Sequence, residues 1–278
     1  MTRSRLILLT LALSLLAAPT FAADSVIVAG IDLFRTLGNG NTHTSFADEP
    51  LPAGFFCSGS EPFTGDIAFR GVPVTTLEKG ALGRTDTIVQ RLDDAVFDEA
   101  GVAHTRVQVR AMEFVGLKPI RTKCGLYGVR LTLEGEQPIT NMKIIREHEW
   151  GGRFEAPIHV NVKLTFHPLH AQAGEAVEVV RPVRFAANKA ARWTDRPGTA
   201  GRVHTEAVVL DLDRDGIFEL ELPGTSNFAA GWRVPKAALN EALAKGLAPA
   251  TSALAALQIQ HCNDPDNCTK EHDTYSAQ

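Results

Sequence analysis

The acidic stretch from Asp211 to Glu219, with the sequence DLDRDGIFE, holds the residues best suited to chemistry in this chain. Carboxylates at its first, third and fifth positions can converge on one hard cation, and the glycine at the sixth position permits a sharp bend. An EF-hand also needs a glutamate at the twelfth position, where this chain has Leu222, so Glu219 at the ninth position fits a shorter loop between β-strands better. The pattern predicts a calcium site formed by Asp211, Asp213, Asp215 and Glu219.

A plain β-hairpin explains the same residues without a metal. Strands over Val208–Leu212 and Ile217–Leu222 would then flank a turn at Arg214-Asp215-Gly216. Asp-Gly pairs are common in such turns because glycine accepts a positive φ. The sequence leaves both interpretations open.

Histidines form a weaker candidate metal site. His159 and His167 share the polar parity of one predicted strand, but eight residues of extended chain place them roughly 26 Å apart. His148, between Glu147 and Glu149, could complete a site only across strands. Solvated histidines on a strand are the more usual reading of this pattern.

No catalytic signature emerges from the remaining polar residues. The Cys57-Ser-Gly-Ser60 segment is not a G-x-S-x-G nucleophile elbow, and it lacks the strand–turn–helix context. Glu147 and Glu149 could serve glycoside hydrolysis, although alternating acids are ordinary on a wet strand face. We therefore expect a non-enzymatic structural or ligand-binding module. The alternative is an extracellular or periplasmic hydrolase whose site is assembled across strands.

The four cysteines predict two disulfides. An even count in an exported chain favours pairing. Cys262 and Cys268 close a short, turn-rich loop, which leaves Cys57 to pair with Cys124. A zinc site is the rival interpretation, but the C-x5-C spacing is not that of a zinc knuckle.

The first 22 residues predict a cleaved secretory signal peptide. Arg3 and Arg5 precede an apolar run from Leu6 to Leu16, and small residues ending at Ala22 mark the expected cleavage site. The run is too short for a membrane-spanning helix, and nothing later resembles one. We therefore expect a secreted or periplasmic protein with no integral membrane segment after cleavage.

Composition narrows the range of partners. The formal charge is −4, and it becomes −6 without the leader, which contains two arginines and no acid. A mildly acidic chain without a basic run argues against nucleic acid as a partner. The expected partner is an unknown extracellular ligand or surface.

Period-2 alternation of apolar and polar residues dominates the middle of the chain. It is clearest over Ile158–Phe166 and Tyr127–Glu134, and in Arg106–Val115 the phase shifts near Ala111, which predicts a bulge. Such strands bury one face and leave the other in water. The expected fold is mainly β, an antiparallel β-sandwich over 23–185. A smaller α+β portion over 186–278 is expected to hold the hairpin, a helix beginning at Pro235 and the Cys262–Cys268 loop.

Three phrases in the first half carry a resemblance. They are Gly30-Ile-Asp-Leu-Phe-Arg-Thr36, the stretch 52–65 (PAGFFCSGSEPFTG) and Asp86-Thr-Ile-Val-Gln-Arg91. In this order they resemble a group of uncharacterised bacterial secreted proteins, some with C-terminal sorting tails. The resemblance brings no reaction, ligand or functional residue. Physically, the phrases read as loop and turn signals, with Phe55, Phe56 and Phe63 able to plug one end of a sandwich.

Overall fold

β-Strands make up nearly all the regular structure in the described part of the chain. The computed structural model describes residues 26–74, 84–149, 151–170, 175–185, 191–194, 200–203, 207–211, 220–223, 228–229 and 240. Within those residues, no helix has the length and hydropathy needed to cross a membrane. The expectation of a mainly β fold with antiparallel sheets is confirmed.

The strands fall into three sheets, which comprise thirteen strands, three strands (β15–β17) and two strands (β1 and β6). In chain order the strands are β1 (Val26–Ile27), β2 (Gly30–Phe34), β3 (His43–Ser45), β4 (Asp66–Gly71), β5 (Thr87–Arg91), β6 (Ala95–Val96), β7 (Val102–Gly116), β8 (Ile120–Thr122), β9 (Gly125–Leu133), β10 (Ile139–His148), β11 (Gly151–Glu155), β12 (Ile158–Pro168), β13 (Val177–Phe185), β14 (Arg192–Thr194), β15 (Ala200–Val203), β16 (Ala207–Asp211), β17 (Leu220–Pro223) and β18 (Phe228–Ala229).

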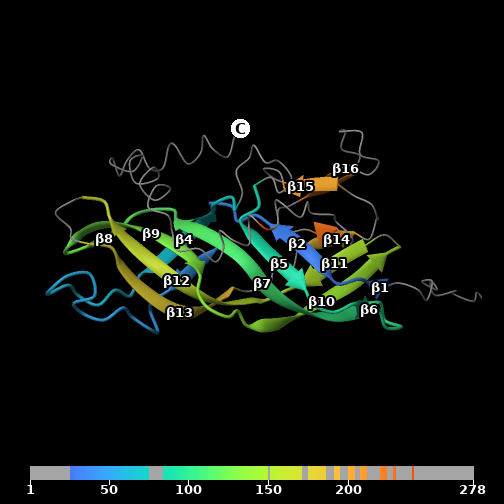
Figure 1. Ribbon diagram of the computed structural model, residues 1–278, viewed down its shortest axis with the longest axis horizontal. Coiled ribbons are helices and arrows are strands. Elements are labelled where there is room, and N and C mark those ends of the chain that lie inside the picture. The colour runs from blue at the N-terminus through green and yellow to red at the C-terminus, as the bar shows by residue number, and fades with distance from the viewer. Residues whose placement is uncertain are drawn as a thin grey trace, which may run out of the picture.

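The long strand β7 lies in the middle of the largest sheet. Its first half pairs with β10 and β5, and its last residues pair with β9 and β4. Figure 1 shows the consequence: β7 crosses the middle of the molecule, with β4, β8, β9, β12 and β13 toward one end and β2, β5, β10, β11 and β14 toward the other. One strand therefore joins two groups of strands around a shared core.

The bulge expected near Ala111 is present. Ile88 pairs with Ala111, while the next residue, Val89, pairs with Val109, so Arg110 is the extra residue on β7. A bulge increases local twist and bends its strand. It lies where β7 passes from one group of strands to the other.

The alternation in β9 and β12 places one row of side chains in the core, as expected. Val160, Val162, Leu164 and Phe166 are all at most 1% exposed. The opposite face is less exposed to solvent than predicted. Three of its residues are also buried: Arg130, Thr132 and Thr165. Their polar groups find partners within the sheet: Arg130 donates to Glu113 over 2.7 Å, and Thr165 donates to Glu178.

The phenylalanines of segment 52–65 do close one end of the core. The Phe56 ring lies 5.0 Å from Tyr127 and 5.4 Å from Phe166, between ring centroids, and Phe55 packs edge-on against Phe166. The Cys57–Cys124 disulfide ties this segment to the turn before β9, so that predicted pairing is confirmed.

The reading of the first and third phrases as loops and turns is wrong. Gly30–Phe34 forms β2 and Thr87–Arg91 forms β5, and the two strands pair in antiparallel register from Gly30↔Arg91 to Phe34↔Thr87. Both strands are short and buried on both faces, so their sequences show no alternation.

The two strands of the expected C-terminal hairpin are present as β16 and β17, and the turn expected at Arg214-Asp215-Gly216 lies outside the described residues. They pair in antiparallel register, with Leu210 opposite Leu220, and β15 extends the sheet on the other side of β16. Strands β14 and β18 instead join the largest sheet through β11. The helix expected from Pro235 lies outside the described residues except for Asn240, which is helical.

Candidate functional site

The predicted calcium loop lies almost wholly outside the described residues. Asp211 is the last residue of β16, while Asp213, Asp215 and Glu219 fall in the undescribed stretch between β16 and β17. Cys262 and Cys268 also lie outside the described residues. The calcium site and the second disulfide therefore stay predictions.

The histidines are not brought together with other ligands. His159 and His167 lie on the same strand, β12, as expected. Among the residues that the structure describes, no group of three or more His, Cys, Asp or Glu side chains could hold a metal ion. Burial, and then the neighbouring Arg130, lowers the pKa of His167, which favours its neutral form.

The carboxylate of Glu147 forms ion pairs with two arginines, Arg153 and Arg192. It lies 3.1 Å from Nε of Arg153 and also accepts a hydrogen bond from Arg192. These partners sit on the adjoining strands β11 and β14. Glu147 thus belongs to a surface ion-pair network that joins three strands, and Glu149 lies outside β10.

A pocket of about 350 Å³ opens beside the middle of β7, between the two groups of strands. Pockets of a few hundred Å³ are the usual size for small-molecule sites. Its apolar lining comes from five strands and comprises Phe34, Met112, Phe114, Phe154, Ile158 and Phe185. Its polar lining comprises Arg35, Thr36, Asn41, Thr42 and Thr87.

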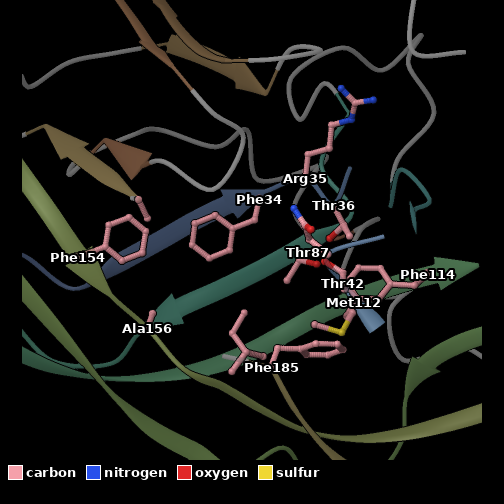
Figure 2. Close-up of a pocket in the computed structure, with 13 residues that line it drawn as sticks. Phe34, Arg35, Thr36, Thr42, Thr87, Met112, Phe114, Phe154, Ala156 and Phe185 are labelled. Carbon is pink, nitrogen blue, oxygen red and sulfur yellow. The ribbon is translucent and has the colours of Figure 1, made fainter. Parts of the chain in front are cut away.

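Phenylalanine rings line the pocket: in Figure 2, Phe154 and Phe34 lie on one side, and Phe114 lies beside Met112 and Thr42. Phe34 on β2 and Phe154 on β11 lie with ring centroids 6.2 Å apart and planes only 14° from parallel. Phe114 and Phe185 meet edge-to-face at 6.0 Å. Rings held in place by neighbouring rings offer a flat apolar surface without the entropy cost of ordering flexible chains.

Threonine side chains gather at the end of the pocket away from Phe154. Thr36, Thr42 and Thr87 lie close to one another in Figure 2, whereas the guanidinium of Arg35 points away from the rings. Thr87 begins β5 and is 2% exposed, and Thr36 and Thr42 are half-buried. The pocket therefore has an apolar body and a hydroxyl-rich end.

A buried carboxylate, Asp86, lies directly behind these hydroxyls. Thr87 Oγ1 donates to Asp86 Oδ1 over 2.8 Å, and Thr36 Oγ1 donates to the same oxygen over 3.2 Å. The backbone N–H of Thr36 donates to Asp86 Oδ2. The carboxylate thus receives three hydrogen bonds from the residues that form the polar end.

Backbone pairing and a glycine fix the position of Asp86. Its N–H donates to the carbonyl of Phe34, and its carbonyl accepts from the N–H of Glu113. Gly71 on β4 leaves the space that the carboxylate fills, because a Cβ there would lie 1.6 Å from Asp86 Oδ2. Burial raises the pKa of Asp86 to about 7 against the lowering effect of the Thr36 and Thr87 hydrogen bonds and of the Arg35 charge.

No match came from comparing the chain with protein-family models, curated proteins and solved structures. The geometry of the pocket therefore carries the functional argument.

Sequence reasoning overlooked this site, although its residues lie in the phrases already singled out. Thr36 ends the first phrase, and Asp86 and Thr87 begin the third. The available signal was an aspartate close before the apolar pair Ile88-Val89, since an aspartate that is buried at the start of a strand needs a hydrogen-bonding partner. If the phrases are read as loops, the aspartate is expected in solvent, where it needs no buried partner.

Proposed function

We propose that this protein is a secreted or periplasmic, non-enzymatic β-sandwich module that binds a small ligand in the pocket beside β7. The observation that carries the proposal is the combination of a pocket of about 350 Å³, a lining of phenylalanine rings and a threonine-rich end. Ligand sites are typically largely apolar pockets with a few placed polar groups. The phenylalanine rings belong to paired strands, and Thr36 and Thr87 are held by their hydrogen bonds to the buried Asp86, which supports a pocket that is formed before a ligand arrives.

Filling the pocket tests this proposal. Indole and naphthalene are suitable probes, and their binding can be followed by saturation-transfer NMR. Ala156 lines the pocket and Ala156→Phe should occupy part of it, so we expect binding to be lost. Val180→Phe on β13 is the control, because Val180 is 59% exposed and is not among the lining residues. Equal binding by both variants and the parent protein would place the probes elsewhere and remove the proposal.

A hydrolase is the alternative function, and one observation favours it. Aspartates with a strongly raised pKa beside a pocket are typical of acid–base catalysis, and Asp86 has a pKa of about 7. Against this, Asp86 is 0% exposed, and both of its oxygens already accept hydrogen bonds. Hydrolysis of nitrophenyl glycosides or esters that is abolished by Asp86→Asn would favour the enzyme.

Export rests on the predicted leader, and calcium binding rests on the predicted acidic loop. Mass spectrometry of protein recovered from the periplasm or medium of an expressing bacterium should find a chain that begins at Ala23. Calcium should raise the melting temperature relative to a chelator, and Asp213→Asn should remove that difference. Intact leader in the recovered protein, or identical melting in calcium and chelator, would count against these two parts separately.

A further inference from the structure

The direction of the hydrogen bonds at the threonine end limits which ligands the pocket can accept. A threonine hydroxyl has one hydrogen to donate and two lone pairs that accept. An ionised carboxylate only accepts. Since Thr36 Oγ1 and Thr87 Oγ1 both donate to Asp86 Oδ1, each has directed its single hydrogen away from the pocket and toward the carboxylate.

The same carboxylate also takes the backbone donor at this position. The N–H of Thr36 points to Asp86 Oδ2, so neither donor of Thr36 is directed at a ligand. The Thr36 and Thr87 hydroxyls thus keep only oxygen lone pairs to offer to a ligand. The polar end next to Asp86 therefore acts as a pair of hydrogen-bond acceptors.

We propose that the pocket selects small, uncharged ring compounds that carry an N–H or O–H donor, with the donor bonded to the Thr36 and Thr87 hydroxyl oxygens and the ring buried against Phe34, Phe154 and Phe185. This inference rests on the proposed binding function and specifies its ligand class. Phenols and indoles belong to this class. The ring supplies affinity through apolar burial, and the donor supplies orientation.

Charge complementarity excludes the two charged alternatives. An anionic ligand would place its oxygens against the threonine lone pairs and close to the Asp86 carboxylate. A cationic ligand would lose its hydration against a largely aromatic lining, and the charge of Arg35, which acts on the ionisation of Asp86, already offsets that carboxylate. An uncharged donor avoids both penalties.

Three bicyclic probes of nearly the same shape separate this inference from simple apolar binding. Indole carries an N–H donor, benzofuran carries a ring oxygen that only accepts, and indene carries neither. At pH 8.5, where Asp86 is ionised, indole should bind about 5- to 10-fold more tightly than benzofuran, as expected for one satisfied hydrogen bond. Indene should bind at least as tightly as benzofuran, since it has no lone pair facing the threonine oxygens.

Single substitutions test whether the threonine hydroxyls cause the preference for a ligand with a hydrogen-bond donor. Thr87→Val removes one acceptor at nearly constant volume, so it should weaken indole binding toward the benzofuran value and leave indene binding unchanged. Thr132→Val on β9 is the matched control, because Thr132 is also buried but is not among the residues that line the pocket. Thr87→Ser keeps the hydroxyl and should keep the preference, which covers the case in which Thr87→Val does not fold.

The outcomes distinguish this inference from the function on which it depends. Equal dissociation constants for indole and benzofuran in the parent protein would overturn the donor preference and leave the binding function intact. Failure of all three probes to bind would overturn the binding function itself. An unchanged preference in Thr87→Val, Thr36→Val and the double variant would place the donor contact elsewhere and also reject the inference.

Discussion

Asp32 and Arg91, which lie 59 residues apart in the chain, form a fully buried ion pair toward the Gly30–Arg91 end of the β2–β5 ladder. Nε of Arg91 lies 3.1 Å and 3.0 Å from the two carboxylate oxygens of Asp32, and the side chains are 1% and 0% exposed. Arg91 also donates to the carbonyl of Val28. This pair and the Thr36–Asp86 contacts hold β2 and β5 in register at opposite ends, and so position the pocket wall.

Breaking the buried pair should destabilise the fold strongly. Asp32→Asn leaves a buried guanidinium without its counter-charge, which typically costs about 3–5 kcal/mol of unfolding free energy. Replacing both partners, as in Asp32→Leu with Arg91→Met, should cost less than the sum of the two single changes. Urea denaturation of the parent protein, of Asp32→Leu, of Arg91→Met and of the double variant measures the coupling free energy between the two side chains.

The exposed pair between Asp93 and Arg106 provides the control. Its contact distance, 2.7 Å, is shorter than that of the buried pair, but its side chains are 40% and 57% exposed. Water and salt screen such pairs. Asp93→Asn should therefore change the denaturation midpoint far less than Asp32→Asn, and equal effects would contradict the role of burial.

Gly71 should tolerate no side chain. Gly71→Ala would place its Cβ 1.6 Å from Asp86 Oδ2, so the carboxylate or β4 would have to move, and the threonines of the pocket would move with it. Gly128 on β9 is a matched control, because a Cβ there meets Leu169 at an ordinary 3.4 Å. We expect Gly71→Ala to lower the melting temperature by several degrees and to lose probe binding, and Gly128→Ala to change both little.

The ionisation of Asp86 should make stability fall with rising pH. The pKa of Asp86 is raised from 3.8 to about 7, so the folded state binds this proton more tightly than the unfolded state. Its contribution is fully present below about pH 4 and is lost progressively as pH rises to about 7, an effect on the order of 2–4 kcal/mol. Arg35 is the charged group that faces Asp86, while β4 and β7 contribute the uncharged Gly71 and the Glu113 backbone.

Asp86→Asn isolates this contribution, because it cannot titrate. The difference in unfolding free energy between the parent protein and Asp86→Asn, measured by urea denaturation at pH 4, 5, 6, 7 and 8, should change steadily up to about pH 7 and then level off. The indole preference over benzofuran should weaken below the same pH, since a protonated Asp86 frees a threonine hydrogen to face the pocket. A difference that is constant with pH would be inconsistent with a raised pKa.

The Cys57–Cys124 disulfide should stabilise the end of the core that segment 52–65 covers. It joins residues 67 positions apart, and closing a loop of that length is worth about 4 kcal/mol in the chain-entropy treatment. Cys57→Ala with Cys124→Ala should therefore lower the denaturation midpoint substantially. Cys262→Ala with Cys268→Ala, which opens a much shorter predicted loop, should have a smaller effect, and thiol titration of the unfolded parent protein should find no free thiol.

The amino-acid sequence by itself determined the class of fold and the local features that depend on near neighbours. Alternation in 127–134 and 158–166 predicts β9 and β12, because a strand turns successive side chains to opposite faces. The phase shift in 106–115 predicts a bulge near Ala111, which the structure has at Arg110, and the count and spacing of the cysteines predict the Cys57–Cys124 pair. Each of these signals can be read within one segment or from a count of residues.

Only the tertiary structure decided that the first and third phrases are neighbouring strands and that they build a pocket. Asp32 stands among apolar residues and Asp86 lies between Thr85 and Thr87, and nothing local to either aspartate shows that Arg91 and Thr36 are their partners. Those contacts form because β2 and β5 both pair into the ladder around β7, and burial then makes an unpartnered carboxylate too costly to leave. Pairing between distant segments, rather than local propensity, creates the site.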